Sequence, residues 1–110
     1  TYLSAVKTKG KTLHPALAPC QVSSLKESRA MRLIVDRCDA REALRFHTTC
    51  LTRIYPHGSR YNSSNYNPFP FLSRGAQLVA LNYQTNDVAL QCYRGLFLQS
   101  GGCGYVLKPP

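Results

Sequence analysis

The order of the predicted strands and helices indicates an α/β fold with about four parallel strands. Residues 76–82 are almost continuously apolar, as in a strand that is buried on both faces of a parallel sheet. Residues 52–55 form a second, short strand pattern, and Pro56 ends it because proline cannot donate to a sheet ladder. Helical patterns separate these strands, and such alternation is typical of βαβ units.

Two further strands and two helices are expected in the amino-terminal half. Ser24, with Glu27 three residues later, has the spacing of a capping box and predicts a helix to about residue 35. Asp39 opens a second helix over residues 40–47 in the same way. The first helix carries one apolar stripe, formed by Met31, Ile34, Val35 and Cys38. The remaining segments are strands at 2–6 and 20–23, a basic loop at 7–11 and a loop at 12–19.

The carboxyl-terminal half begins with a long loop over residues 57–71, rich in Ser, Asn, Gly, Tyr and Pro. Loops of this length inside a compact domain are usually functional. A helix over residues 88–97 follows the apolar strand, with Asn86 or Asp87 as its cap and glycines at its end. Residues 105–107 are expected to be extended.

Charge and cysteine content restrict the class of protein. Fourteen Lys and Arg against five Asp and Glu give a net charge of +9, which favours an anionic partner: nucleic acid, an acidic membrane leaflet or a phosphorylated ligand. The five cysteines include no close pair, which argues against zinc and predicts buried, reduced thiols in a cytosolic protein. The length and both ends predict a small domain or a piece of a larger one.

Arg53 and Tyr55 form the main candidate site. They share one face of a strand near its carboxyl end, where a guanidinium beside an aromatic ring suits an anion with a stacking surface. Asp36 or Glu42 could neutralise Arg53 internally, but acids are scarce, so an external anion is favoured. Ser24 follows another strand and is either a helix cap or a ligand group, with its neighbour Ser23 as a one-residue ambiguity.

Four motifs in this order carry a resemblance to a known family: TRIYPHGSR, NSSNYNP, QLVALNYQT and GGCGYVLKPP. They resemble the Y half of the catalytic barrel of eukaryotic phosphoinositide-specific phospholipase C, over about residues 24–110. The wording of the last two motifs leans toward the epsilon-like branch. The resemblance implies that residues 1–110 are the carboxyl-terminal half of a TIM-type (β/α)8 barrel, whose X half is not in this chain.

The resemblance also implies a function: calcium-dependent hydrolysis of phosphatidylinositol 4,5-bisphosphate to diacylglycerol and inositol trisphosphate in signal transduction. The family's catalytic histidines and calcium ligands belong to the X half, so neither catalytic nor metal-binding residues are expected here. Ser24 and Arg53 correspond to positions that contact a ring phosphate, and Tyr55 to one that packs on the inositol ring. The implied partners are an anionic membrane lipid, contacted peripherally from the cytoplasm, and the X half.

Two departures from the family pattern affect the loop after Tyr55. Asn62 replaces the acid that usually precedes SSNY, and Ser59 stands where relatives often carry a membrane-probing Trp. Two other functions stay open: a catalytically inactive phospholipase-like protein that binds phosphoinositides and, more distantly, a basic nucleic-acid-binding module. No nucleic acid is expected as the partner.

Overall fold

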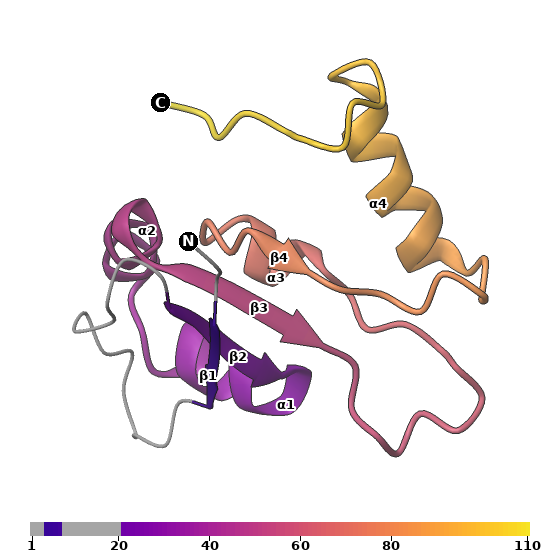
Figure 1. The fold of residues 1–110 in the computed structure, drawn as a ribbon, viewed down its shortest axis with the longest axis horizontal. Helices are drawn as coiled ribbons and strands as arrows, with labels where there is room; N and C mark the ends of the chain where they lie inside the picture. The colour runs from indigo at the N-terminus through magenta and orange to yellow at the C-terminus, as the bar shows by residue number, and fades with distance from the viewer. Residues whose placement is uncertain (1–3, 8–20) are drawn as a thin grey trace.

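The computed structural model describes residues 4–7 and 21–110, which contain a four-stranded parallel sheet (Figure 1). Strands that are neighbours in the sheet are also neighbours in the sequence: β1 (Ser4–Lys7), β2 (Gln21–Lys26), β3 (Leu51–Tyr55) and β4 (Leu78–Val79). The predicted α/β fold with parallel strands is therefore confirmed. Residues 2, 3 and 20 of the first two predicted strands, and the predicted loops over 8–19, lie outside the described residues.

The two faces of the sheet have different surroundings. Leu25, Ile54 and Val79 belong to a buried core that also contains helical residues. Successive strand side chains point to opposite faces, and on the other face Arg53 is exposed and Leu78 is 45% exposed. Among the described residues, helices cover one face only, so the other face of the apolar fourth strand is exposed in this chain. The strand is also shorter than the predicted residues 76–82.

The predicted helix cap at Ser24 is wrong. Ser24 lies inside β2, where it pairs with Arg53 in the parallel ladder. Helix α1 (Glu27–Ala30) begins three residues later, and its cap residue Lys26 makes no capping hydrogen bond through its side chain. The local spacing matches a capping box, but Ser24 is paired within the sheet. Glu27 accepts hydrogen bonds from the distant residues His57 and Arg60.

The predicted apolar stripe of this helix is shifted. Helix α1 continues into a π-helical segment, η1 (Met31–Asp36), in which the backbone N–H of Arg37 donates to the carbonyl of Arg32, five residues earlier. This wider turn changes which residues share a face. The buried residues are Ala30, Leu33 and Ile34. Val35 and Cys38 are partly buried against the core, and Met31 is exposed.

Helix α2 (Ala40–Thr49) begins where the sequence predicts it. The side chain of Asp39 accepts a hydrogen bond from the backbone N–H of Arg41 at 3.2 Å, so Asp39 is confirmed as the cap. The helix buries Ala43 and Phe46, while Leu44 stays exposed. It also buries an imidazole, that of His47, near its end.

His47 is the centre of a buried polar network at the amino end of β3. Its Nδ1–H donates to the carbonyl of Arg74 at 2.7 Å, which leaves Nε2 to accept from the hydroxyl of Thr52 at 3.0 Å. Gln77 binds the same region, since its amide donates to the carbonyl of His47 and its oxygen accepts from the backbone N–H of Thr52. Lys108 also donates to the carbonyl of His47, at 2.9 Å. The network joins α2, β3 and the segments before and after β4.

This network predicts a pH-dependent loss of stability. Burial lowers the pKa of His47 below its ordinary value, and the nearby Lys108 lowers it further, against the opposing Arg74 carbonyl. Because the folded-state pKa is lowered, neutral His47 makes its full contribution to the free energy of unfolding above the unfolded pKa of about 6.5. That contribution is lost as pH falls toward the folded pKa. The thermal midpoint of the protein that contains this chain should be lower at pH 5 than at pH 7.5. His47→Gln should reduce this difference. An unchanged pH dependence in the variant would contradict this role of His47.

The long loop after β3 extends beyond the carboxyl ends of the strands (Figure 1). It runs into a short helix, α3 (Phe69–Leu72), which the sequence does not predict, because residues 69–71 were expected to belong to the loop. Tyr66 fastens the loop to the sheet, because its buried hydroxyl donates to the carbonyl of Ala80 at 2.8 Å. Burial raises the pKa of Tyr66, so the phenol keeps its proton.

Helix α4 (Val88–Leu98) stands beside the sheet, at the upper right of Figure 1. Asp87 caps it by accepting from the backbone N–H of Leu90 at 3.1 Å, which selects Asp87 over Asn86. Gly101 and Gly102 follow it with φ of 69° and 67°, a left-handed conformation that glycine adopts without strain. Residues 105–107, predicted to be extended, do not join the sheet.

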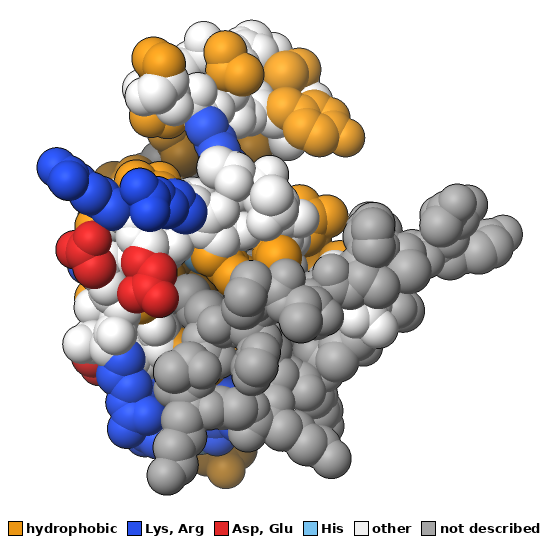
Figure 2. Space-filling model, turned by 90° about the vertical axis from the view of Figure 1, so that its left-hand side faces the viewer, with side chains coloured by type: hydrophobic (Ala, Val, Ile, Leu, Met, Phe, Trp, Pro, Cys, Tyr) orange, Lys and Arg blue, Asp and Glu red, His pale blue; other side chains and the backbone are white. Residues whose placement is uncertain are grey.

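Figure 2 shows how charged and apolar side chains are distributed on one face. Lys and Arg side chains lie on both sides of a small acidic group, and apolar side chains gather at the top, near α4 and the segment after it. Exposed apolar residues of that region include Leu98, Tyr105 and Leu107. No helix within residues 4–7 and 21–110 is long and apolar enough to cross a membrane.

The cysteines are less uniformly buried than predicted. Cys50 is buried and Cys38 is half-buried, but Cys92 and Cys103 are exposed. Burial, followed by the neighbouring Glu42, raises the pKa of Cys38 to about 11, so this thiol stays protonated near neutral pH. Cys20 lies outside the described residues.

Candidate functional site

The three predicted site residues come together on the open face of the sheet. Ser24 of β2 and Arg53 of β3 are direct partners in the parallel register. The guanidinium Nη1 of Arg53 donates to the hydroxyl of Ser24 at 3.2 Å. The Arg53 Cζ atom lies 5.2 Å from the centroid of the Tyr55 ring, within cation–π distance. A hydroxyl, a guanidinium and an aromatic ring thus form one continuous surface.

Strand alternation explains why Ser24, and not Ser23, belongs to this cluster. Ser23 is 1% exposed and, like its register partner Thr52, is fully buried on the helix-covered face. Ser24 lies on the opposite face with Arg53. The one-residue ambiguity between the two serines is resolved by the register in favour of Ser24.

Arg53 is available to an external anion. Within the described part of the chain the one ion pair is that of Glu27 with Arg60, so neither Asp36 nor Glu42 neutralises Arg53. The side chain of Arg53 is exposed, as access to an external anion requires. A guanidinium has five N–H donors, and a neutral hydroxyl occupies one of them here. The others suit a phosphate, which accepts two parallel hydrogen bonds from Arg.

Other basic residues occupy neighbouring register positions. Lys7 of β1 is the register partner of Ser24, and Lys26 of β2 is the partner of Tyr55. The side chain of Lys26 is exposed. With Arg53, these positions place a basic residue on each of three adjacent strands, while acidic residues are absent from all four strands. The charge distribution of the sheet therefore favours an anionic ligand.

The sequence interpretation did not assign a functional role to Glu27 and Arg60. Their carboxylate–guanidinium pair connects the start of α1 with the loop after β3, and the Arg60 Nη2 to Glu27 Oε2 distance is 2.7 Å. The spacing of Glu27 from Ser24 instead predicts a capping box. The scarcity of acids is the signal that could have indicated this ion pair. With five Asp and Glu against fourteen Lys and Arg, a Glu has many possible basic partners and is expected to pair with one of them.

Asn62 has a hydrogen-bond acceptor at the position where the family pattern usually has an acid. Its Oδ1 accepts from the backbone N–H of Ser64 at 3.1 Å, so the loop retains an acceptor at this position. Ser63 between them adopts a positive φ of 58°. Ser59, at the position often held by Trp, donates its backbone N–H to the imidazole of His57.

The histidines do not form a set. His47 lies at the amino end of β3 and His57 lies beyond its carboxyl end, while His14 is outside the described residues. Within residues 4–7 and 21–110, no group of three or more His, Cys, Asp or Glu side chains could hold a metal ion. The described residues therefore do not fit a calcium site, and no chemical step is assigned to calcium in this chain.

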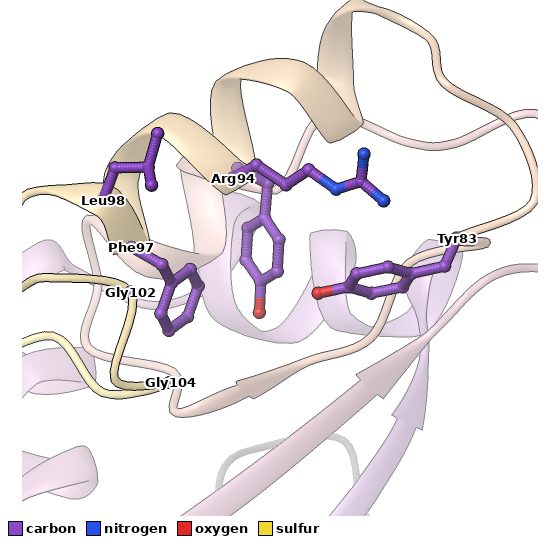
Figure 3. Close-up of a pocket in the computed structure, with 7 residues that line it drawn as sticks. Tyr83, Arg94, Phe97, Leu98, Gly102 and Gly104 are labelled. Carbon is purple, nitrogen blue, oxygen red and sulfur yellow. The ribbon is translucent and has the colours of Figure 1, made fainter.

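A separate hollow lies between α4 and the loops on either side of it (Figure 3). Its volume is about 490 Å³, and Arg94 lies over the ring of Tyr83 at 5.6 Å from Cζ to centroid. None of Ser24, Arg53 and Tyr55 contributes to it. The residues that line it are Tyr83, Tyr93, Arg94, Phe97, Leu98, Gly102 and Gly104.

Comparison with known proteins identifies the family. The sequence profile of the phosphatidylinositol-specific phospholipase C Y domain matches residues 1–110. The chain belongs to this family. Its similarity to phospholipase C sequences and structures extends over most of its length. Human 1-phosphatidylinositol 4,5-bisphosphate phosphodiesterase delta-3 is 49% identical over 105 residues, which cover 93% of this chain. The delta-1 enzyme of Rattus norvegicus is 46% identical over 89 residues, or 81% of the chain.

A solved phospholipase C structure has the same local fold. The crystal structure of PLC21 from L. pealei matches 82% of this chain with a TM-score of 0.74 and 41% sequence identity. The chain spans only 13% of the delta-3 relative and 11% of the L. pealei protein. The relatives named here are of the delta type or from L. pealei, and the leaning toward an epsilon-like branch stays a prediction.

Proposed function

We propose that this Y domain is the headgroup-orienting part of a phosphoinositide phospholipase C, which hydrolyses phosphatidylinositol 4,5-bisphosphate to diacylglycerol and inositol trisphosphate. The names of the relatives support the reaction, since they are 1-phosphatidylinositol 4,5-bisphosphate phosphodiesterases. The observation that carries the local role is the cluster of Ser24, Arg53 and Tyr55. It offers hydrogen-bond donors, a positive charge and a flat apolar surface within one patch.

In this proposal Arg53 and Ser24 bind one phosphate of the inositol ring. The guanidinium supplies charge-assisted hydrogen bonds to two oxygens of this phosphate. The Ser24 hydroxyl, on the adjacent strand, donates a hydrogen bond to an oxygen of the same phosphate. Tyr55 packs against the face of the ring, whose C–H groups suit an aromatic surface. The headgroup is then fixed at three points, so that the phosphodiester meets the catalytic groups in one orientation.

The catalytic groups and the calcium ligands are proposed to lie outside this chain, in the X half of the same barrel. Two features support a missing half. The strand order leaves β1 and β4 at the edges of the described sheet, and none of the helices in residues 21–110 covers the face that carries Arg53. A (β/α)8 barrel needs eight strands, so four parallel strands with helices on one face correspond to half of it.

The proposed site of action is the surface of a membrane on its cytoplasmic side. The net charge of +9 supports peripheral attraction to anionic lipids, where each Lys or Arg near the surface contributes about 1 kcal/mol. Ser59 cannot insert into lipid as a Trp would, so electrostatic attraction contributes more than insertion to the membrane binding of this chain. We therefore infer a peripheral contact whose strength decreases as ionic strength rises.

The Tyr55 ring provides a specific test of the proposed contact. Tyr55→Phe should be mild, because the ring face is retained, whereas Tyr55→Ala should be severe, because both the ring and its contact with Arg53 are lost. The measurement is hydrolysis of phosphatidylinositol 4,5-bisphosphate by the protein that contains this chain. A severe effect of Tyr55→Phe would mean that the hydroxyl, and not the ring, is the contact.

Hydrolysis itself tests the proposed function. The protein that contains this chain should release inositol trisphosphate from vesicles with phosphatidylinositol 4,5-bisphosphate in the presence of calcium, and a calcium chelator should abolish the release. Vesicle binding by sedimentation is measured in parallel. Binding without hydrolysis at any calcium concentration would identify a catalytically inactive, phosphoinositide-binding relative. Equal binding to single-stranded nucleic acid and to vesicles would favour the basic nucleic-acid module.

A further inference from the structure

Glu27 connects two strand ends through a single carboxylate. It is the first residue after β2, and its side chain is 13% exposed. Three donors from the loop after β3 converge on it: the backbone N–H of His57 at 2.8 Å, Nη2 of Arg60 at 2.7 Å and Nε of Arg60. A carboxylate that accepts from both arms of a guanidinium fixes distance and direction together. The loop after β3 is thereby attached to the end of β2.

The same arginine continues the connection toward β4. Arg60 Nη1 donates to the hydroxyl of Ser64 at 3.0 Å, and the carbonyl of Ser64 accepts from the side-chain amide of Asn82 at 3.1 Å. Asn65 then donates to Asp87, through its backbone N–H at 2.9 Å and its side chain at 3.1 Å. The polar contacts therefore extend from β2 through the long loop to the start of α4.

The Glu27–Arg60 pair is stronger than an ordinary surface ion pair. Its two side chains are 13% and 27% exposed, so water screens it only in part. Burial raises the pKa of Glu27, but the hydrogen bonds from Arg60 and from the His57 N–H lower it more, and the net pKa is below the ordinary value. The pKa of Arg60 is raised by its hydrogen bond to Glu27. Both groups are therefore charged across the physiological range.

The pair lies directly beyond the candidate site along both strands. Glu27 follows Lys26, the register partner of Tyr55, and Ser24 is three residues before it. We propose that Glu27 and Arg60 are positioning residues: their ion pair holds the carboxyl ends of β2 and β3 together, so that Ser24 and Arg53 meet the same phosphate. This inference rests on the proposed function. The pair itself makes no hydrogen bond to Ser24, Arg53 or Tyr55, so its effect is transmitted through the strand ends.

The test uses the relative rates on two lipids in the whole protein that contains this chain. Rates are measured on vesicles with phosphatidylinositol 4,5-bisphosphate and on vesicles with phosphatidylinositol, which lacks the ring phosphates. A change that only destabilises the fold reduces the active fraction and lowers both rates equally, so the ratio stays constant. Misplacement of Ser24 against Arg53 affects only the lipid with ring phosphates. The ratio of the two rates is therefore the readout that a structural role would not change.

Arg60→Lys is the main variant, because it retains the charge and loses the two-armed geometry. We expect the ratio to fall roughly tenfold, less than the hundredfold that a displacement of about 1 Å can cause. Glu27→Gln, which retains an acceptor for the His57 N–H, should give an intermediate loss. Arg45→Lys makes the same chemical change on the exposed surface of α2 and should leave both rates unchanged.

The outcomes separate the positioning role from the proposed function. A wild-type protein that hydrolyses neither lipid refutes the proposed function and this inference with it. A wild-type protein that prefers the bisphosphate, with the same preference in Arg60→Lys and Glu27→Gln, overturns the positioning role alone. The thermal unfolding of Arg60→Ala is compared with that of the wild-type protein, to establish whether the variant folds. If it fails to fold, the decision rests on the ratio in Arg60→Lys, which retains the charge.

Discussion

Residues 1–110 expressed alone should hydrolyse no phosphatidylinositol 4,5-bisphosphate, and addition of the X half of the same protein should restore hydrolysis in the presence of calcium. The sheet explains the first part. β1 and β4 are its edge strands, so their outer N–H and C=O groups lack strand partners within the described sheet. The described part of the chain also provides no helical cover for the face that carries Arg53 and Leu78. We expect the isolated chain to aggregate, to dimerise through its edges or to be loosely packed.

The two halves together should cover each other's edges and complete the site. The measurement is lipid hydrolysis by each half and by the mixture, with light scattering on every sample. A soluble monomer of residues 1–110 that melts sharply would contradict the half-barrel proposal. A mixture that assembles without hydrolysing lipid would favour the catalytically inactive relative.

Arg53→Glu should reduce turnover of phosphatidylinositol 4,5-bisphosphate far more than turnover of phosphatidylinositol. A hydrogen bond to a charged group is worth about 1.5–3 kcal/mol, which corresponds to about 10- to 150-fold in rate, and charge reversal adds repulsion. The loss applies only where a ring phosphate is present to accept the bond. Phosphatidylinositol should therefore be nearly unaffected.

A matched control separates this local effect from a general loss of positive charge. Arg45→Glu changes the net charge by the same amount on the exposed surface of α2, so it reports any weaker attraction to anionic vesicles. It should lower both rates slightly and leave their ratio unchanged. Equal losses on the two lipids with Arg53→Glu would instead mean that Arg53 has a structural role.

The candidate site was predictable because it depends on local rules. Strand alternation places Arg53 and Tyr55 on one face, and Pro56 marks the end of the strand. The position of Ser24 beside Arg53 required the register of two parallel strands, which are 29 residues apart at this contact. No local pattern specifies that register, and sequence alone therefore left Ser23 and Ser24 as alternatives.

The errors have a common origin in distant partners. Glu27 fits a capping box locally, yet its hydrogen bonds go to His57 and Arg60, which are 30 and 33 residues away. The π-helical turn of η1 moved the buried face by changing the local period. Leu78 belongs to an apolar strand of the kind that is buried on both faces, but the cover that would bury it is absent from the described residues. Local periodicity could not anticipate any of these three features.

The central claim is that Ser24 and Arg53 bind the same phosphate of the headgroup, and a double-mutant cycle tests it most directly. Ser24→Ala, Arg53→Met and the double variant are compared by the ratio of their rates on phosphatidylinositol 4,5-bisphosphate and phosphatidylinositol. Each single variant should lower the ratio, and the double variant should lose little more than Arg53→Met alone, with a coupling of at least about 0.5 kcal/mol. Independent, fully additive losses, or a ratio that no variant changes, would contradict the claim.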